Sequence, residues 1–364
     1  MMNDRLQQIT EAMTSRGWDM LLITDPKHVY YLTGFASDPH ERFLGLALCR
    51  GEEPLLMVPA LDAETAAAAS SVTHIVTHQD TDQPYELLRK RIPGSIGTLA
   101  LEKDQLTVSR YERLQHHFSA RDYVDAGEVL REMRVRKSAD EIRTMKQAAI
   151  LVEQVLSEGL KQVKAGVQEI ELVAELEYLM KKLGADGPSF ETMVLAGPNT
   201  ALPHGVPGSR RIREGDLLMF DLGVFSGGYA SDITRTFAVG GIGPEAEKIY
   251  NTVLAANEAG IRAVKPGVTY GSIDKAARSV IDRAGYGKAF VHRLGHGLGM
   301  DVHEYPSVHG LNGDLLQTGA VFTIEPGIYV PGLGGVRIED DVLVTEEGAE
   351  VLTSFPKQLT VIGC

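Results

Sequence analysis

The chain has 364 residues, which exceeds the usual size of one domain and predicts two. Its composition is that of an ordinary globular protein, with 43% hydrophobic residues, and a formal net charge of −13 disfavours nucleic acid or an anionic membrane as a partner. Two cysteines, Cys49 and Cys364, argue against a disulfide framework, and no signal-peptide core or run of membrane-spanning length occurs, so we expect a cytoplasmic protein.

The first part of the chain alternates strand-like and helical patterns. Apolar and β-branched runs predict strands over residues 18–24, 43–49 and 73–78. Helical patterns occupy residues 60–70 and 83–91 between and after them. This alternation is typical of an α/β domain, and it contains no cluster of residues that suggests catalysis.

A basic stretch at residues 134–137 separates this part from a long helical pattern. Ser138, with Glu141 three residues later, forms a capping-box signature at the start of apolar positions with helical spacing. We therefore predict an N-terminal domain over residues 1–133 and a second domain over residues 134–364.

The second domain contains an internal repeat. The segment VKAGV at 163–167 recurs as VKPGV at 264–268, and each is followed by a helical pattern that ends in Leu-Gly or Ala-Gly. Two pairs of strand segments then match, each with glycine first and a carboxylate last: GDLLMFD (215–221) with GAVFTIE (319–325), and GYASD (228–232) with GVRIE (335–339). We predict two halves, each a helix pair and a β-hairpin, facing each other across a pseudo-twofold axis.

The hairpins bring four carboxylates together. The midpoint between Asp221 and Asp232 falls between the serine and first glycine of a Ser-Gly-Gly turn signal, so we expect the two aspartates to lie opposite each other. The midpoint between Glu325 and Glu339 falls on Gly332, inside a second turn, and predicts the same for the glutamates. Across the pseudo-twofold axis the four acids would converge.

Four acids on one apolar face repel one another and are costly to desolvate unless they are neutralised. Two divalent cations would balance their four charges, so we predict a dinuclear metal site. His296, in the glycine-interleaved segment HRLGHGLGMDVHE (292–304), would complete the ligand set, although any one of these residues alone is more often a solvated acid or a structural histidine. Arg293 stands where the zinc-protease helix motif requires glutamate, which excludes that motif.

The segments that carry these residues, FDLGVFSGGYASDITRTF, HRLGHGLG, IEPGIY and GVRIEDDVLV, resemble the proline-specific metallopeptidases of the pita-bread fold. That group includes Xaa-Pro dipeptidase (prolidase) and aminopeptidase P. The segment MLLITDPKHVYYLTGF at residues 20–35 looks like the creatinase/prolidase-type N-terminal domain. The resemblance implies an α/β N-terminal domain followed by a pseudo-twofold pita-bread catalytic domain. The complete ligand set distinguishes the chain from creatinase, which works without metal.

The resemblance also implies roles for individual residues. Asp221 would bind one metal, His296 and Glu325 the other, and Asp232 and Glu339 both. Manganese is the expected metal, with cobalt or zinc as alternatives. Glu325 would also shuttle a proton, and four further residues would lie beside the substrate: His204, His292, His303 and Arg337.

The implied reaction is hydrolysis of the imide bond in a dipeptide with C-terminal proline, by a metal-activated hydroxide. The alternative is an aminopeptidase P, which releases the N-terminal residue of longer peptides with proline second. A non-catalytic peptide-binding module is a third hypothesis, which the complete ligand set disfavours. The compact N-terminal domain favours the dipeptidase.

A charged loop at residues 37–43 suggests a further substrate contact. The resemblance implies a homodimer, in which the N-terminal domain of one subunit can approach the active site of the other. Asp38, His40 or Arg42 would then reach across and, with Arg293, bind the carboxylate of the substrate. The alternative is an ordinary solvated loop.

Overall fold

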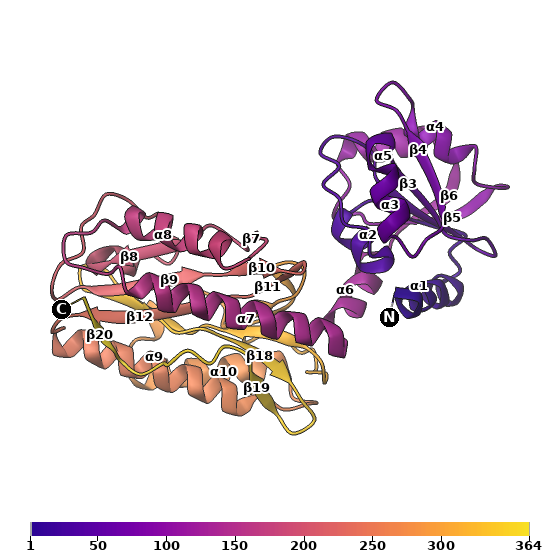
Figure 1. Ribbon diagram of the computed structural model, residues 1–364. Helices are drawn as coiled ribbons and strands as arrows, with labels where there is room; N and C mark the ends of the chain where they lie inside the picture. The colour runs from indigo at the N-terminus through magenta and orange to yellow at the C-terminus, as the bar shows by residue number, and fades with distance from the viewer. Residues whose placement is uncertain (1, 364) are drawn as a thin grey trace. The chain divides into compact units, whose positions relative to one another are not determined.

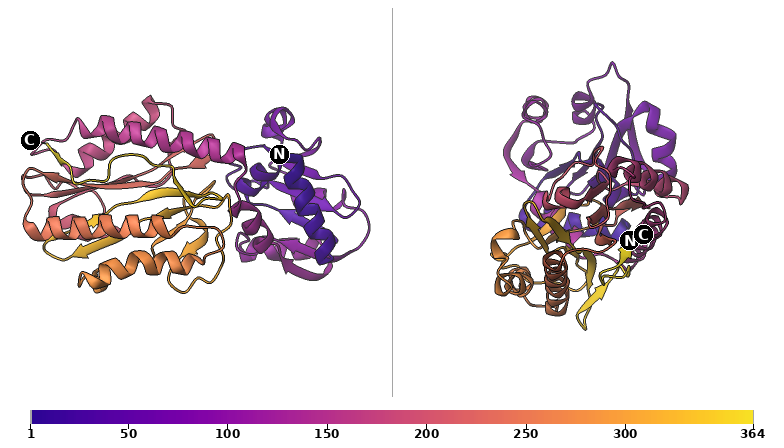
Figure 2. Two further views of the ribbon diagram at one scale, coloured as in Figure 1. Left: turned by 90° about the horizontal axis from the view of Figure 1, so that it is seen from below. Right: turned by 90° about the vertical axis from the view of Figure 1, so that its left-hand side faces the viewer.

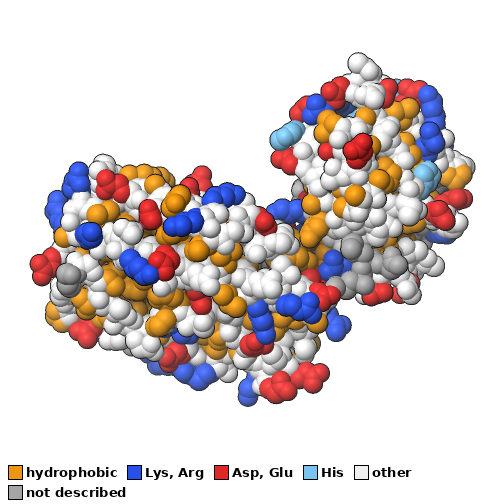
Figure 3. Space-filling view, in the orientation of Figure 1, with side chains coloured by type: hydrophobic (Ala, Val, Ile, Leu, Met, Phe, Trp, Pro, Cys, Tyr) orange, Lys and Arg blue, Asp and Glu red, His pale blue; other side chains and the backbone are white. Residues whose placement is uncertain are grey.

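The computed structural model describes residues 2–363, and the chain divides between Met133 and Arg134 into two compact units (Figure 1). Each unit has its own hydrophobic core. No helix within residues 2–363 combines the length and the apolar character that crossing a membrane requires. On the face drawn in Figure 3, acidic and basic side chains are interspersed, and no large basic patch is seen there.

The first unit is built on a six-stranded sheet in the order β4-β3-β2-β1-β5-β6. Its strands are β1 (Met20–Ile23), β2 (Gly45–Cys49), β3 (Leu55–Pro59), β4 (His74–His78), β5 (Ile96–Leu101) and β6 (Ala120–Asp125). Its helices are α1 (Met2–Arg16), α2 (Pro26–Thr33), η1 (Ala60–Asp62), α3 (Ala63–Ala69), α4 (Pro84–Arg89), α5 (Val108–His117) and α6 (Gly127–Val135), the last of which continues past the division between the units. The three predicted strands are confirmed as β1, β2 and β4, and the two predicted helices as α3 and α4.

The second unit contains two helix pairs and a set of strands between them (Figures 1 and 2). The helices are α7 (Ala139–Leu160), α8 (Glu169–Lys182), α9 (Pro244–Ala263) and α10 (Tyr270–Arg283), with short η2 (Gly197–Ala201) and η3 (Gly287–Ala289). The strands are β7 (Gly187–Pro188), β8 (Met193–Ala196), β9 (Leu217–Leu222), β10 (Val224–Ser226), β11 (Tyr229–Ala230), β12 (Ile233–Val239), β13 (Gly295–Gly297), β14 (Glu304–Val308), β15 (Val321–Ile324), β16 (Gly327–Val330), β17 (Gly334–Arg337), β18 (Asp340–Val344), β19 (Ala349–Val351) and β20 (Val361–Ile362). The two larger sheets run β20-β12-β9-β8 and β14-β13-β15-β18-β19.

The capping box predicted at the start of the second unit is confirmed. The Ser138 hydroxyl accepts a hydrogen bond from the Glu141 N–H, and the Glu141 carboxylate accepts one from the Ser138 N–H at 2.9 Å. Two backbone donors at the N-terminus of α7 are bonded in this way, which explains why the helix begins here.

The internal duplication is also confirmed. Each half contains two helices followed by three antiparallel strands, α7-α8-β8-β9-β12 and α9-α10-β13-β15-β18. The repeated Val-Lys-Xaa-Gly segments make the same turn, because the N–H groups of Gly166 and Gly267 each donate to a backbone carbonyl, of Ile212 and Leu316, at 2.9 Å. A buried apolar cluster lies within each half.

The predicted register of the first hairpin is wrong. Asp221 pairs with Thr234 and not with Asp232, because the turn is centred one residue later, on two glycines. Gly227 and Gly228 both have positive φ, 57° and 79°, as a two-residue hairpin turn of this hand requires. Thr234 and Asp232 are two residues apart, so Asp232 still shares a face with Asp221.

The second hairpin has the predicted register, with Gly332 at its turn. Glu325 and Glu339 therefore lie opposite each other. Both lie where the backbone pairing of the hairpin is interrupted, between the β15–β18 ladder and the β16–β17 ladder. Pro326 lies in the same interruption and has no N–H to donate.

A buried ion-pair network joins the start of the second unit to the segment around Glu304. Lys137 Nζ lies 2.7 Å from Glu304 Oε1, and the Arg134 guanidinium contacts both Glu304 and Asp301. Burial would raise the pKa of Glu304, but the charges of Lys137 and Arg134 outweigh it and lower the pKa. The network therefore holds the segment that carries the predicted substrate residue His303 against the beginning of the unit.

We expect Glu304→Gln to lower the free energy of unfolding by about 3 kcal/mol or more at neutral pH, because it leaves Lys137 buried without a counter-charge. Since the pKa of Glu304 is lowered in the folded protein, its contribution is present above the ordinary glutamate pKa and lost as the pH falls through the lowered value. Urea unfolding of both proteins across this range measures the difference.

The matched control is the exposed Glu347, whose change to glutamine should alter stability by less than about 0.5 kcal/mol. A difference between wild type and Glu304→Gln that does not shrink at any acidic pH at which both proteins remain folded would contradict a role for the Glu304 charge.

Candidate metal centre

All five predicted metal ligands line one cavity of about 520 Å³ in the second unit. Each is placed at a strand or beside its end. Asp221 lies in β9, Asp232 directly precedes β12, His296 is the central residue of β13, Glu325 directly follows β15, and Glu339 directly precedes β18. The four carboxylates therefore converge as predicted, although the register of the first hairpin differs.

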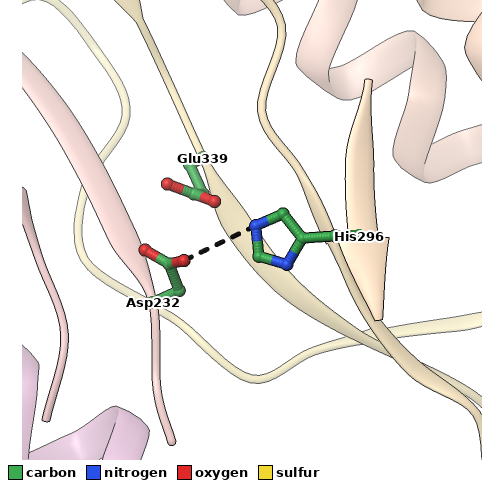
Figure 4. A group of neighbouring side chains, drawn as sticks. All are labelled: Asp232, His296 and Glu339. Atoms are coloured by element: carbon green, nitrogen blue, oxygen red, sulfur yellow. Dashed lines mark ion pairs between the residues drawn. The ribbon is translucent and has the colours of Figure 1, made fainter. Parts of the chain in front are cut away.

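The His296 ring faces the Asp232 carboxylate through Nε2, which lies 3.7 Å from Asp232 Oδ2 (Figure 4). The same nitrogen lies 3.4 Å from Glu325 Oε1. Its Nδ1 lies 3.2 Å from the Gly297 carbonyl oxygen, which can only accept, so Nδ1 carries the proton. Burial lowers the pKa of His296 to about 3, so the ring is neutral and Nε2 presents a lone pair. The Nε2 lone pair and the two carboxylate oxygens are all acceptors and would repel one another, so a cation between them would stabilise the arrangement.

Two buried carboxylate oxygens in the same cluster have no hydrogen-bond partner among the described residues. They are Asp232 Oδ1 and Glu339 Oε1, and both side chains are almost fully buried. Ligand atoms of Asp232, His296 and Glu339 lie within 4.8 Å of one another. Buried acceptors without donors are costly, and a cation would satisfy them.

The carboxylates also raise one another's pKa values. Burial and then the charge of Glu339 raise the pKa of Asp232 and of Glu325, and burial and then Asp221 raise the pKa of Glu339 to about 7. The charge of Arg337 lowers the pKa values of Glu325 and Glu339, but it is a single positive charge beside four acids, and burial also raises the pKa of nearby Asp341. These residues fit divalent cations, whose charge would restore the ionised forms.

Arg337 and Thr234 contact two of the predicted ligands, Asp221 and Glu339. The Arg337 guanidinium contacts Asp221 Oδ2, and its Nε donates to Thr234 Oγ1 at 3.0 Å. Thr234 Oγ1 in turn donates to Glu339 Oε2 at 2.7 Å. The sequence analysis missed Thr234, although its position two residues after Asp232 places it on the same face of the strand.

His292 is engaged at both ring nitrogens. Nδ1 lies 2.7 Å from the Arg293 carbonyl oxygen and therefore donates, so Nε2 accepts from the Tyr329 hydroxyl at 3.0 Å. The Tyr329 oxygen then accepts from Arg337 at 2.9 Å. Burial lowers the pKa of His292 to about 4, so the ring is neutral in this chain of hydrogen bonds. Tyr329 was not predicted, because its partners are distant in sequence.

His204, His303 and Arg293 also line the cavity, as expected for residues beside a substrate. His204 is exposed in the loop after η2. The His303 ring packs edge-on against His296, with ring centroids 4.1 Å apart, and burial followed by the charge of Arg293 lowers the pKa of His303. Arg293 Nη1 donates to Ser307 Oγ at 3.2 Å.

The three residues predicted in the charged loop belong to the first unit. Asp38 and His40 are exposed, and His40 has a positive φ of 53° with its N–H bonded to Asp38 Oδ1. Arg42 Nε donates to Asp80 Oδ1 at 2.7 Å, which raises the pKa of Arg42 and lowers that of Asp80. Within the unit, Arg42 is therefore paired, whereas the other two side chains face solvent.

The chain is similar to known proteins over its full length. A protein from Bacillus subtilis (strain 168) named "Putative dipeptidase YkvY" is 46% identical over 99% of this chain and 100% of its own. The solved structure of an Xaa-Pro dipeptidase from Bacillus anthracis has a TM-score of 0.94 and 34% identity, covering 100% of both chains. That of an X-Pro aminopeptidase from Thermotoga maritima has a TM-score of 0.88 and 33% identity, covering 95% of this chain and 98% of its own.

The two units match different family descriptions. Residues 5–136 match the creatinase/prolidase N-terminal domain, and residues 143–346, more than half of the chain, match metallopeptidase family M24. The predicted fold class is thereby confirmed: an α/β creatinase-type domain precedes a pseudo-twofold pita-bread domain. The chain is a member of metallopeptidase family M24 with a creatinase/prolidase-type N-terminal domain.

Proposed function

We propose that this protein is an Xaa-Pro dipeptidase that hydrolyses dipeptides with C-terminal proline and uses two divalent cations, with Mn²⁺ as the physiological metal. The single observation that carries the metal site is the His296 lone pair facing the Asp232 and Glu325 carboxylates, beside buried oxygens without donors. Similarity to an Xaa-Pro dipeptidase over the whole of both chains supports the substrate class.

The ligands would divide between the two cations. Asp221 would bind one, His296 and Glu325 the other, and Asp232 and Glu339 would bridge them. In support, Asp232 and Glu339 are the two of these four acids in which the structure of residues 2–363 shows a buried oxygen without a hydrogen-bond partner. When bound, the cations supply a water that is acidic enough to act as a nucleophile near neutral pH.

Side chains of the cavity would transfer the proton, stabilise the negative oxygen and orient the peptide. The Glu325 carboxyl, at the cavity wall beside His296, would take a proton from the nucleophilic water and deliver it to the departing proline nitrogen. His303 would donate a hydrogen bond to the oxygen that becomes negative in the transition state, as its position against His296 supports. His204, exposed on the rim, would orient the peptide.

Arg337 and His292 would act through other residues. Arg337 is fully buried among Asp221, Thr234 and Tyr329, which supports a role in orienting Asp221. His292 uses both ring nitrogens inside the protein, which supports a role in the wall of the cavity. We propose that the domain boundary lies between Met133 and Arg134. The homodimer and the cytoplasmic location remain predictions.

A comparison of two substrates separates the dipeptidase from the aminopeptidase alternative. With Mn²⁺ added, we expect an Xaa-Pro dipeptide to be cleaved and the Xaa-Pro tripeptide with the same first residue to be cleaved poorly. Liquid chromatography of the released first residue, which cleavage of either substrate liberates, measures both rates. A clear preference for the tripeptide would identify an aminopeptidase, and cleavage of neither would favour a binding module.

The metal site is tested by removing one ligand. We expect Glu339→Ala or Asp221→Ala to abolish both Mn²⁺ binding, measured by calorimetry, and turnover, measured with the dipeptide. Wild type treated with a chelator should lose activity and regain it with Mn²⁺. Full turnover by a variant that binds no metal would contradict the proposal. Glu347→Ala, at an exposed site, is the matched control.

A separate test concerns recognition of the substrate carboxylate. We propose that Arg293 binds it together with Asp38, His40 or Arg42 of the charged loop. We expect Arg293→Ala and Arg42→Ala to raise KM for the dipeptide about tenfold, since hydrogen bonds to charged groups contribute about 1.5–3 kcal/mol. The dipeptide amide, which lacks the carboxylate, should show no such change. An unchanged KM for the free dipeptide would contradict this role. Arg213→Ala, at an exposed arginine, is the control.

A further inference from the structure

We propose that Asn257 is a positioning residue for the metal ligands Glu325 and Glu339, because its carboxamide bonds to the backbone directly before each of them. The inference rests on the proposed metal site. Asn257 lies on α9, behind the strands, and is fully buried. Within residues 2–363, its side chain bonds to the Ile324 and Ile338 carbonyls and to Lys357, and to neither glutamate side chain, so its effect would pass through the backbone.

The gap in the second hairpin explains why a side-chain donor is needed. In the register of this hairpin Pro326 lies opposite Ile338, and the Ile338 N–H points to the Pro326 carbonyl oxygen at 3.5 Å. An antiparallel pair of this kind normally exchanges a second bond in return, but proline has no N–H. Asn257 Nδ2 supplies the missing donor to the Ile338 carbonyl at 3.3 Å.

The same amide reaches the other strand. Asn257 Nδ2 lies 3.0 Å from the Ile324 carbonyl oxygen, so one NH₂ group ties together the two peptide units that lead into Glu325 and Glu339. The Ile324 and Ile338 peptides lie at the interruption between the β15–β18 ladder and the β16–β17 ladder. The spacing of the two glutamates at this point is therefore set by the amide of Asn257 and not by strand pairing alone.

The orientation of the amide follows from its third contact. Asn257 Oδ1 lies 3.0 Å from Lys357 Nζ, and an ammonium group can only donate. The oxygen must therefore face Lys357, which turns the NH₂ toward the two carbonyls. Lys357 is fixed in turn by Asp340 at 2.8 Å, and Asp340 is also paired with Arg235. The amide is thus held in one orientation by a buried network.

The first half of the duplicated unit has no such device. The position 101 residues earlier, by the offset of the repeated turn, is Leu156, which is fully buried. There the ladder between β9 and β12 runs from Leu217–Ala238 to Leu222–Ile233 and stops before Asp232, but this break contains no proline, and the Asp232 N–H donates to Asp341 Oδ2 at 3.1 Å. The amide occurs in the half whose interrupted ladder contains a proline.

The close approach of α9 to the strands makes the contact possible. Gly260, one turn after Asn257, lies against β15 so closely that an added Cβ would meet the Ile324 side chain at 3.0 Å. A helix packed at this distance brings a side chain as short as asparagine within reach of the strand carbonyls.

The test uses Asn257→Leu, which introduces the residue found in the first half and removes the donor. Groups that support metal ligands from outside the ligand set typically affect metal affinity by about 10–100-fold, so we expect the Kd for Mn²⁺ to rise about tenfold or more. Calorimetry measures the Kd, and urea unfolding without metal measures stability separately. Asn251→Leu, at an exposed asparagine on the same helix, is the matched control and should bind Mn²⁺ as wild type does.

A second variant tests the missing donor itself. Pro326→Ala restores a backbone N–H opposite Ile338, so the double variant Asn257→Leu with Pro326→Ala should recover part of the lost affinity. No recovery would contradict the missing-donor argument.

A wild-type Kd for folded Asn257→Leu would overturn the proposal, since Asn257 would then stabilise the fold alone. If Asn257→Leu stays unfolded even at saturating Mn²⁺, Asn257 is needed for the fold itself, and the proposal is likewise overturned. If wild type itself binds no Mn²⁺ and cleaves no dipeptide, the proposed function is wrong and this inference falls with it.

Discussion

The mutual repulsion of four buried carboxylates is the constraint on which the rest of the second unit depends. Asp221, Asp232, Glu325 and Glu339 come from four strand termini and line one cavity with the neutral His296 ring. Burial and proximity would drive protons onto these acids, which would remove the charge that the site needs. Divalent cations resolve this conflict, and their absence would make the arrangement unfavourable.

The fold meets this constraint by duplication with one asymmetry. Each half supplies two acids from a β-hairpin, and a helix pair supports each hairpin from outside. The ladder of the first hairpin pairs Asp221 with Thr234 and stops just before Asp232, so its acids lie diagonally. The ladder of the second hairpin is interrupted at a proline, where Glu325 and Glu339 lie opposite each other. Buried polar groups behind the strands compensate for that interruption. Thr234 supports Glu339 directly, and Asn257 bonds to the backbone before both glutamates.

Much of this could be predicted from the sequence, because the repeated segments and the turn signals are local patterns. The convergence of the four acids and His296, the duplication and the register of the second hairpin were all accessible in this way. The register of the first hairpin was not, since two adjacent glycines allowed the turn to shift by one residue. Tyr329 and Asn257 were missed because their partners lie many residues away, and their roles appear only when the strands and helices are assembled.

Anomalous diffraction from crystals grown with Mn²⁺ tests the central claim most directly. The account predicts two manganese peaks within bonding distance of the four carboxylates, with one of them bound to Nε2 of His296. Crystals that show the acids gathered as here, with no manganese between them at saturating concentration, would contradict it.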